Sequence, residues 1–418
     1  MLNSLLYLRN RLSEILWFRP LSMCVLSIFA AWIAYLAGFW FEDIPFPEVS
    51  GESLKMLLGV LTSGMLVIAT FAAGAMISAY ASASQTATPR AFPIIVSDDV
   101  SQNALSTFVG AFLFSVVALL ALLNEAYTPS GRFFLLILTL CVFWTVVLTF
   151  IRWVDRIARL GRLGMTLEKV EQTVTRSIKH YHKSWLWNQP AELPDQTSGR
   201  KVTHEKIGYL QRVNWDALQS IAEEAEIEIQ IQVTPGTFVT PERTIALLQA
   251  EDEELPEETI ERIQNAFRIG SQRVFDEDPR FGFIVLSEIA SRALSPAVND
   301  PGTAIQIIGQ FVRLLHLWKN PKATFDPENQ TSYGRLSAPR ISIESLLDDS
   351  FLGISRNGAS FKEVMVRLQK AYRSLEAIDP DAAVQIQTLS EQSLQRAKSA
   401  IELKDDFEAV QDAASPKE

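Results

Sequence analysis

The chain has 418 residues, a length that allows two or three domains. Its formal net charge of −10 gives no support to a nucleic-acid partner. Its two cysteines, Cys24 and Cys141, both fall inside apolar segments, so the sequence indicates neither a disulfide framework nor a zinc site. We therefore expect no metal and no cofactor.

The long, strongly hydrophobic stretches of the chain lie in the first 151 residues. Four stretches there contain no charged residue, namely residues 20–41, 56–89, 100–124 and 133–151. Each is long enough to cross a hydrocarbon core about 30 Å thick. Apolar residues surround every face of these stretches, which favours lipid over the core of a soluble protein. We predict four transmembrane helices, at about residues 20–41, 56–80, 104–124 and 133–151, and expect the first to be retained rather than cleaved as a signal peptide.

Basic residues mark one side of the predicted spans. Those on this side are Arg9, Arg11, Arg19, Arg90, Arg152, Arg156, Arg159 and Arg162. The opposite loops are acidic or short, with Arg132 as an exception. The positive-inside rule therefore predicts a multi-pass membrane protein with both termini in the cytoplasm.

The second predicted span is longer than a membrane requires and rich in small residues at four-residue spacing, such as Gly74 and Ser78. That spacing allows close packing of helices in lipid, so this span is either a central packing helix or the lining of a pore. The candidate pore-facing residues are Ser78, Ser82, Gln85 and Thr86. No ionisable residue lies in the middle of any span, which disfavours proton-coupled transport.

A helical pattern continues past the fourth span and predicts an extended cytoplasmic helix over residues 152–185. Leu160, Leu167, Val174 and Tyr181 repeat at seven-residue spacing and form an apolar seam. Such a seam requires an apolar partner, either the chain's own domain or a second subunit. Residues 186–200 are rich in proline and polar turn formers and are predicted to be a linker.

Residues 201–250 are predicted to form a small α+β module. "GYLQRV" and "EIEIQIQV" are typical of strands with a short helix between them, and "TFV" and "TIALL" are expected to continue the sheet after a "TPG" turn. Residues 251–404 are predicted to be mainly helical, with helices at 279–294, 301–319, 361–378 and 381–404, while "RLSAPRISI" is compatible with a returning strand. The acidic run over residues 251–261 is interpreted as a helix start rather than a metal site. Residues 405–418 are predicted to be a polar tail.

The stretch "SRALSPAVNDPGTAIQII", residues 291–308, interrupts this helical pattern. Two Asp-Pro pairs, Asp278-Pro279 and Asp300-Pro301, are predicted to open consecutive helices, with aspartate as N-cap and proline in the first turn. The break is therefore predicted to be a corner between two helices.

The same corner is the candidate functional site. Arg292, Ser295, Asn299, Asp300 and Thr303 could converge there, joined from the preceding turn and helix by Arg268, Arg273 and Asp278. Arginine beside aspartate at a capped corner indicates either a buried structural network or an anion pocket built from helix-start amides and arginines. No catalytic motif accompanies it, so an enzyme is not favoured.

The sequence resembles a known family. The run "DPRFGFIVLSEIASRALSPAVNDPGTA", together with "TPRAF", "GYLQRVN" and "TPGTFV", is similar to the bacterial membrane-protein family called domain of unknown function 2254. The resemblance extends over about residues 11–373. It implies four spans in the bacterial inner membrane and a cytoplasmic part, and it implies no activity and no catalytic residues.

These observations predict an α-helical membrane domain of four transmembrane helices followed by a mainly α, mixed α+β cytoplasmic domain. The first hypothesis for its function is a homo-oligomeric, channel-like or transport-related protein with a cytoplasmic regulatory domain. The alternative is a membrane-anchored ligand sensor, enzyme or scaffold that acts through the cytoplasmic domain. The expected partners are the lipid bilayer and further copies of the chain, with an unknown ligand and no nucleic acid.

Overall fold

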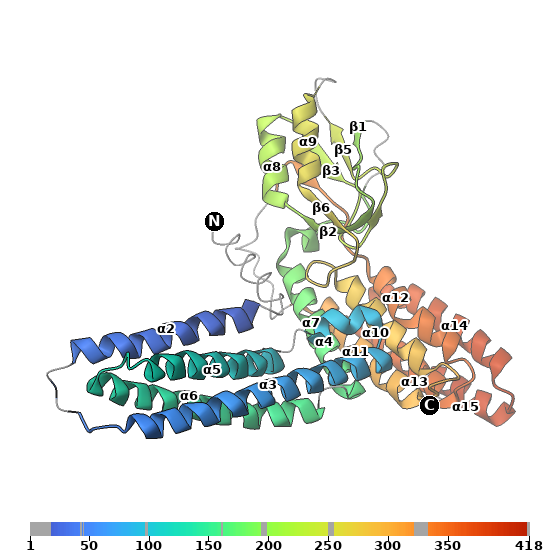
Figure 1. Cartoon of the computed structure of the whole chain (residues 1–418). Coiled ribbons are helices and arrows are strands. Elements are labelled where there is room, and N and C mark those ends of the chain that lie inside the picture. Colours follow the sequence, from blue (N-terminus) through green and yellow to red (C-terminus); the bar gives the residue numbers. More distant parts are fainter. Residues whose placement is uncertain are drawn as a thin grey trace. The chain divides into compact units, whose positions relative to one another are not determined.

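The chain divides into two compact units, Met1–Thr166 and Leu167–Glu418. A computed structural model describes residues 18–41, 44, 46–96, 99–159, 162–193, 199–249, 255–321 and 333–415. The described part of the first unit is helical, and the second unit combines helices with short strands (Figure 1). The prediction of a mostly helical chain, with four long apolar helices first and a mixed α/β region after them, is confirmed.

Four long apolar helices make up most of the described part of the first unit. Their bounds are α2 (Phe18–Trp40), α3 (Gly51–Thr86), α5 (Asp99–Leu123) and α6 (Pro129–Arg159), with the short helices η1 (Pro89–Ala91) and α4 (Phe92–Val96) between α3 and α5. Each long helix is long and apolar enough to cross a membrane. The ribbon shows the four lying side by side (Figure 1).

Consecutive long helices run in opposite directions. Arg19 at the start of α2 forms an ion pair with Asp99 at the start of α5, with 2.6 Å between Nη2 and Oδ1. Arg132, near the start of α6, lies close to Gly51 at the start of α3. Since α2 and α5 begin at one end of the bundle and α3 and α6 at the other, the topology is up and down.

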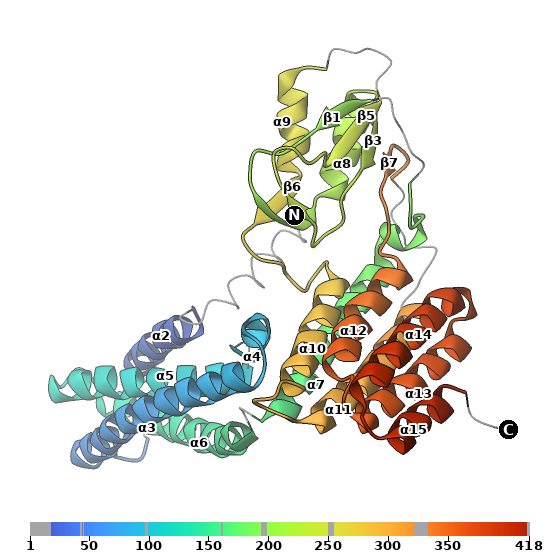
Figure 2. The ribbon, with the colours of Figure 1, turned by 90° about the vertical axis from the view of Figure 1, so that its right-hand side faces the viewer.

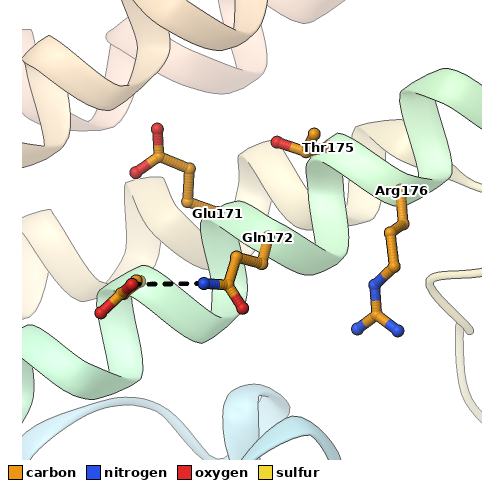
Figure 3. A pocket seen from close by; sticks show the side chains of 5 residues that line it. Glu171, Gln172, Thr175 and Arg176 are labelled. Carbon is orange, nitrogen blue, oxygen red and sulfur yellow. Dashed lines mark hydrogen bonds between the residues drawn. The ribbon is translucent and has the colours of Figure 1, made fainter.

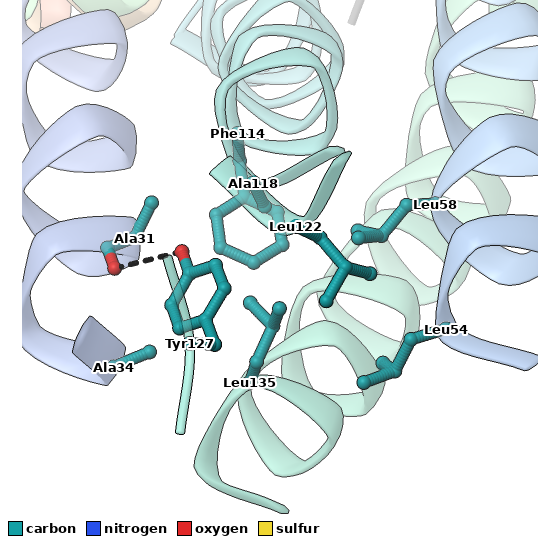
Figure 4. Packing of buried hydrophobic residues seen from close by; sticks show 9 residues of the cluster. All are labelled: Ala31, Ala34, Leu54, Leu58, Phe114, Ala118, Leu122, Tyr127 and Leu135. Carbon is teal, nitrogen blue, oxygen red and sulfur yellow. Dashed lines mark hydrogen bonds between the residues drawn. The ribbon is translucent and has the colours of Figure 1, made fainter. Parts of the chain in front are cut away.

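A cluster of buried apolar residues joins all four helices near the end where α3 and α6 begin. Figure 4 shows Tyr127, in the loop after α5, directed between α2 and α6. Its hydroxyl donates a hydrogen bond of 3.2 Å to the carbonyl of Ala31 on α2. The cluster consists of Ala31, Ala34, Leu54, Leu58, Phe114, Ala118, Leu122, Tyr127 and Leu135.

The central helix of this bundle is α5. In its most apolar segment 44% of the residues are buried, compared with 22% for α3. Close helix packing also occurs away from α3. A Cβ at Gly38 on α2 would overlap Gly131 on α6, and a Cβ at Gly110 on α5 would press on Met23 of α2. Within its own unit α3 is therefore not the central packing helix.

The second unit contains a bundle of helices (Figure 2). Two of its helices, α10 and α12, run parallel: Gly353 lies against Ser287, and Gly358 lies against Leu294. The helices of this bundle are α7 (Leu163–Lys183), α10 (Pro279–Ala293), α11 (Pro301–Lys319), α12 (Ile343–Asn357), α13 (Lys362–Ile378), α14 (Ala383–Ala400) and α15 (Lys404–Ala414), with η2 (Trp185–Asn188) and η5 (Pro380–Ala382) as short turns.

The strands of the second unit form two small sheets. One has the order β1-β5-β3-β7 and the other has the order β4-β2-β6. Helices α8 (Trp215–Glu224) and α9 (Glu257–Asn265) lie beside each other next to these strands (Figures 1 and 2). The strands are β1 (Arg200–Val202), β2 (Gly208–Val213), β3 (Glu228–Ile231), β4 (Phe238–Val239), β5 (Ala246–Gln249), β6 (Phe267–Gly270) and β7 (Leu336–Ser337). We call this part the β module.

The apolar seam of α7 packs on its own unit. Leu167, Val170 and Val174 are fully buried. A Cβ at Gly282 of α10 would overlap the side chain of Val174. The side-chain amide of Gln310 on α11 donates through Nε2 to the carbonyl of Leu167. The seam is therefore filled by the chain's own helices, and it supplies no basis for a subunit interface.

Several elements differ from the pattern expected from the sequence. The sequence predicts one extended helix over residues 152–185, but α6 ends at Arg159 and α7 begins at Leu163. Two glycines in the intervening "LGRLG" lower helix propensity there. The sequence predicts a polar tail from residue 405, yet α15 occupies that region because Val410 and Ala413 are buried against its neighbours. Helix α12 was not predicted.

The sheets also differ from the expected single sheet. The "TFV" strand β4 pairs with β2, whereas the "TIALL" strand β5 pairs with β3 in the other sheet. Strands β6 and β7 come from outside residues 201–250 and complete the two sheets. Such pairings join residues far apart in the chain, and no local pattern encodes them.

Candidate functional site

The stretch after α10 is a tight corner. Asn299 has a positive φ of 52°, a conformation that asparagine tolerates better than most residues. Its amide donates to the carbonyl of Ser295 at 2.8 Å, and the amide of Asp300 donates to the carbonyl of Ala293 at 2.8 Å. These two hydrogen bonds close the backbone of the turn on itself.

Asp300 is the N-cap of α11, as the sequence predicts. Its Oδ1 accepts from the Thr303 amide at 3.1 Å, and its Oδ2 accepts from the Thr303 hydroxyl at 2.6 Å. Both carboxylate oxygens are thus occupied at the helix start. Asp300 thus caps α11 with both of its carboxylate oxygens. Few hydrogen-bonding positions remain on this carboxylate for a ligand.

The remaining predicted site residues at the corner do not converge on a ligand position. The side chains of Arg292 and Asn299 are exposed, and the Ser295 hydroxyl donates to the carbonyl of Arg292 at 2.7 Å. Within the described part of the chain, Arg292 makes no ion pair. The exposed guanidinium and the satisfied cap do not form an anion pocket.

Arg273 and Asp278 lie at the other end of α10. Helix α10 runs from Pro279 to Ala293, and its 15 residues span about 22 Å. Asp278, before the helix, is therefore far from the corner that follows it. The expectation that Arg273 and Asp278 join Asp300 in one site is therefore not met, because one Asp-Pro pair caps each of two consecutive helices.

Asp278 is a buried, charged N-cap with only 1% of its side chain exposed. Its Oδ1 accepts from the Phe281 amide at 3.2 Å, and its Oδ2 lies 2.7 Å from Nε and Nη2 of Arg273. The Arg273 guanidinium in turn lies over the ring of Phe281, 5.3 Å from its centroid. This arrangement fixes the entry of the chain into α10.

The cluster extends to the β module through two further contacts. Gly236, in the turn before β4, lies so close to Asp278 and Arg273 that a Cβ there would overlap both. Glu277, next to Asp278, pairs with Arg212 of β2, with 3.0 Å between Oε1 and Nε. We call this group, made of Arg212, Gly236, Arg273, Glu277 and Asp278, the junction cluster.

Burial perturbs both carboxyl groups of the junction cluster. It raises the pKa of Glu277 to about 7, although Arg212 acts in the opposite direction. Burial also raises the pKa of Asp278 to about 6, with Arg273 opposing the shift. Carboxyl groups that titrate close to neutral pH are enriched at functional sites, although structural ion pairs produce such shifts as well.

The sequence pointed to Asp278 and Arg273 but not to Glu277, Arg212 or Gly236. The acidic run "DED" before Pro279 was a signal for Glu277, yet its partner on β2 is more than 60 positions away in the chain. Three of the motifs quoted above meet at this cluster: "GYLQRVN" supplies Arg212, "TPGTFV" supplies Gly236 and "DPRFGF" begins with Asp278.

A shallow hollow of about 520 Å³ runs along α7, and all of its lining residues belong to that one helix. The Gln172 side chain, labelled in Figure 3, donates through Nε2 to Oε1 of Glu168 at 3.2 Å. Glu171 is engaged by Arg313 of α11 through two hydrogen bonds of 2.7 and 2.8 Å. The hollow is an open polar helix face, without the convergent walls of a ligand pocket.

Two of the four candidate pore-facing residues have described side chains. Ser78 and Ser82 are both exposed on α3. The side chains of Gln85 and Thr86 lie outside the described residues. Among the residues that the structure describes, no group of three or more histidine, cysteine, aspartate or glutamate side chains could hold a metal ion.

The four apolar helices and the mixed α/β unit define a predicted membrane protein that carries a large second unit. The chain belongs to the family of predicted membrane proteins called domain of unknown function 2254, whose model matches residues 13–374. This confirms the resemblance seen in the sequence.

Relatives of the chain include uncharacterized proteins of Mycobacterium bovis and Mycobacterium tuberculosis. The chain is 27% identical to each of them over 192 residues, which are 43% of this chain and 36% of the relative. The chain thus matches little more than a third of the length of these curated relatives. No solved structure matches the chain.

Proposed function

We propose that the chain is an integral protein of the bacterial inner membrane, with four spans and both termini in the cytoplasm. The length and apolar character of α2, α3, α5 and α6 support insertion. The up-and-down topology agrees with the arginine pattern, because Arg19 and Asp99 share one end of the bundle.

Reporter fusions test this orientation. A reporter that is active only outside the cytoplasm should give signal after Glu48 or Thr128 and no signal after Ala91 or at Glu418. Signal at the C-terminus would contradict the proposed topology.

We further propose that copies of the chain associate through the exposed face of α3 and form a channel-like assembly. The supporting observation is that Gly59, Gly64 and Gly74 have no neighbouring atom within 4 Å of a built Cβ. A helix face with small residues allows close backbone approach between helices in lipid. Within its own unit this face of α3 is unused.

Hydroxyl groups accompany these glycines on α3. Ser63 and Thr70 are exposed, and their hydroxyls donate to carbonyls of their own helix, Ser63 to Gly59 at 3.0 Å and Thr70 to Leu66 at 2.8 Å. Their hydrogen-bonding needs are thus met without water, while their oxygens can still accept from a neighbouring helix or a hydrated pore. Ser78 continues this face toward the other end of α3.

Cysteine cross-linking in intact membranes tests the association. In a chain whose Cys24 and Cys141 are replaced by serine, single cysteines at Ser63, Thr70 or Ser78 should form disulfide-linked dimers. Leu148→Cys, at a position of α6 that is also exposed, is the matched control and should remain monomeric. Equal cross-linking at Leu148 would indicate random collision and remove the proposed interface.

The channel-like function needs a separate measurement. Purified protein in planar bilayers should carry ion current, and Ser78→Trp should reduce that current if Ser78 faces the conduction path. A membrane-impermeant thiol reagent should label Ser78→Cys in the assembly. Cross-linked dimers that carry no current would leave an oligomeric membrane protein without channel activity.

The junction cluster favours a second candidate function. Carboxyl groups with strongly shifted pKa values are enriched at functional sites, so a ligand sensor that acts through the second unit is the second candidate. Thermal melts of the full chain with a panel of small anions test this candidate, since a ligand that binds the folded state raises the melting temperature.

A further inference from the structure

The corner between α10 and α11 carries three exposed apolar residues in a row. Pro296, Ala297 and Val298 are all exposed, and 49% of the surface of Val298 is accessible to solvent. Single exposed apolar side chains are common on protein surfaces, whereas three in succession at one turn form a continuous apolar surface. We call these three residues the apolar tip.

The backbone around the apolar tip depends little on water. The amides of Val298 and Asn299 both donate to the carbonyl of Ser295, at 3.1 and 2.8 Å. Pro296 has no amide to satisfy. The carboxylate of Asp300, which follows the tip, is occupied at the start of α11. Movement of this turn from water to less polar surroundings therefore breaks few hydrogen bonds.

The packing of α7 on α10 shows at which end of the bundle the tip lies. The Ser177 hydroxyl of α7 is 3.5 Å from the carbonyl oxygen of Asp276, just before α10, and Val174 packs on Gly282. The two helices are therefore antiparallel. The rise from Gly282 to the end of α10 is about 16 Å, and the rise from Val174 back to the start of α7 is about the same. The corner after α10 thus lies at the end of the bundle where α7 begins.

The packing of α11 gives the same position. The Gln310 side chain donates to the carbonyl of Leu167. Farther along both helices, Nε2 of His182 is 3.1 Å from the carbonyl oxygen of Trp318, so α11 runs parallel to α7. The start of α11 is about 14 Å before Gln310, whereas the start of α7 is about 6 Å before Leu167. The apolar tip, which precedes α11, therefore extends past the start of α7.

A short link ties the start of α7 to the end of α6. Helix α6 ends at Arg159 and α7 begins at Leu163, so even a fully extended chain between them spans no more than about 14 Å. Helix α6 is one of the four proposed spans. The chain itself therefore tethers the end of the bundle that carries the apolar tip near a membrane surface.

Basic side chains accompany the tip. Arg292 is in the last turn of α10 and Arg356 is in the last turn of α12, and both are exposed. Gly358, which ends α12, lies against Leu294, so the two arginines share this end of the bundle. Neither forms an ion pair within the described part of the chain. Exposed cations beside an apolar tip match the chemistry of an anionic lipid surface.

We propose that the apolar tip inserts into the headgroup region of the bilayer while Arg292 and Arg356 face the phosphates of anionic lipids. Insertion buries the tip and leaves the helices behind it in water. It holds the second unit to the membrane surface by a contact other than the link between α6 and α7. This inference rests on the proposed membrane insertion of α2, α3, α5 and α6.

The experiment compares a fluorescent label at three valines of the full chain in lipid nanodiscs. Cys24 and Cys141 are replaced by serine, and the label is attached to a single new cysteine. Val298→Cys places it on the tip. Val67→Cys, at an exposed position within α3, reports insertion of the spans themselves. Val384→Cys, at a position that is 79% exposed at the start of α14, is the matched control.

The position of Val384 makes it a suitable control. Gln385 donates to Asp348 near the start of the α12–α14 contact, and Arg396 donates to Ser355 farther along both helices. Helix α14 therefore runs parallel to α12. Since α12 ends beside the corner, α14 begins at the opposite end of the bundle.

The three labels should respond to different quenchers. In nanodiscs that contain phosphatidylglycerol, a nitroxide on the lipid headgroup should quench the Val298→Cys label several-fold more than the Val384→Cys label. Aqueous iodide should quench the Val384→Cys label more strongly. A nitroxide deep in the acyl chain should quench the Val67→Cys label, because that position faces lipid in the middle of a span.

The role of the arginines is tested by charge. Arg292→Gln combined with Arg356→Gln should reduce headgroup quenching of the Val298→Cys label, because the attraction to anionic lipid is lost. Replacement of phosphatidylglycerol by phosphatidylcholine should have the same effect on the parent chain. The paired lysine variants, Arg292→Lys with Arg356→Lys, keep the charge and should retain the quenching.

Each contrary outcome overturns a defined part of the proposal. Equal iodide quenching at Val298→Cys and Val384→Cys, with Val67→Cys quenched from the acyl chain, overturns tip insertion and leaves the spans intact. A Val67→Cys label that no lipid quencher reaches overturns membrane insertion and this inference with it. A Val298→Cys label shielded from both iodide and lipid shows that protein covers the tip. Quenching that ignores lipid charge removes the role of the arginines.

Discussion

Gly236 lies directly against the carboxylate of Asp278, so that a Cβ at position 236 would overlap Oδ2 of that residue. Gly236 also has a φ of 90°, a value that residues with side chains rarely adopt. Two independent requirements, space and backbone conformation, therefore select glycine at this turn of the β module.

The first prediction is that Gly236→Ala destabilises the folded chain by about 2 kcal/mol or more, from backbone strain and from displacement of the Arg273–Asp278 pair. The measurement is the melting temperature of the detergent-solubilised protein. Gly334→Ala is the matched control because no atom lies within 4 Å of its built Cβ. Similar losses for both variants would refute the role of the Asp278 contact.

The second prediction concerns the corner before α11. Asp300→Ala removes an N-cap that bonds both the amide and the hydroxyl of Thr303, and it should cost about 0.5 to 2 kcal/mol of stability. Arg292→Ala, at an exposed position of the same corner, should change stability by less than about 0.5 kcal/mol. A stabilising anion whose effect disappears in Arg292→Ala would instead identify the corner as a binding site.

The third prediction is a loss of stability with rising pH. The pKa of Glu277 rises from 4.5 in the unfolded chain to about 7 in the folded chain, so the folded chain binds more protons between these values. The free energy of unfolding should therefore decrease as pH rises through this window, by on the order of 3 kcal/mol at most. Denaturant titrations of the parent chain and of Glu277→Gln, compared at each pH, should show a steeper decrease in the parent chain, because Glu277→Gln retains only the contribution of Asp278, whose pKa burial also raises.

The fourth prediction addresses the α7 seam. Val174→Glu places an unpaired charge in a fully buried position beside Gly282 and should cost on the order of 3 kcal/mol or more. Gln172→Glu, on the exposed face of the same helix, replaces the bond to Glu168 with a like-charge contact and should cost no more than about 0.5 kcal/mol. Mass measurement should give the same assembly size for every variant that folds. A smaller but folded Val174→Glu assembly would restore the seam as a subunit interface.

The sequence was sufficient for features that depend on local pattern. Four apolar helices, the Asp278 and Asp300 caps and the strand alternation around Ile229 can all be read from neighbouring residues. Contacts between distant residues could not be predicted in the same way. The pairing of Arg212 with Glu277 requires the fold to bring β2 and the 271–278 loop together, and nothing at either position specifies the partner.

Small residues gave the least reliable signal. The repeated glycines of α3 suggested close packing, yet the tight crossings in the first unit involve Gly38, Gly110 and Gly131. A small residue permits a close approach but does not specify which helix approaches. The choice is made by the larger side chains around it, such as Tyr127, whose hydroxyl bonds Ala31 of α2.

The fastening of α2 at both ends limits how the helices of the first unit can move. At its start Arg19 pairs with Asp99, and near its end the carbonyl of Gly38 accepts from the Thr128 hydroxyl at 3.2 Å while Gly131 crosses it closely. A piston-like slide of α2 by one turn, about 5.4 Å, would break both attachments at once. Axial movement of α2 relative to α5 and α6 is therefore opposed at both ends of the helix.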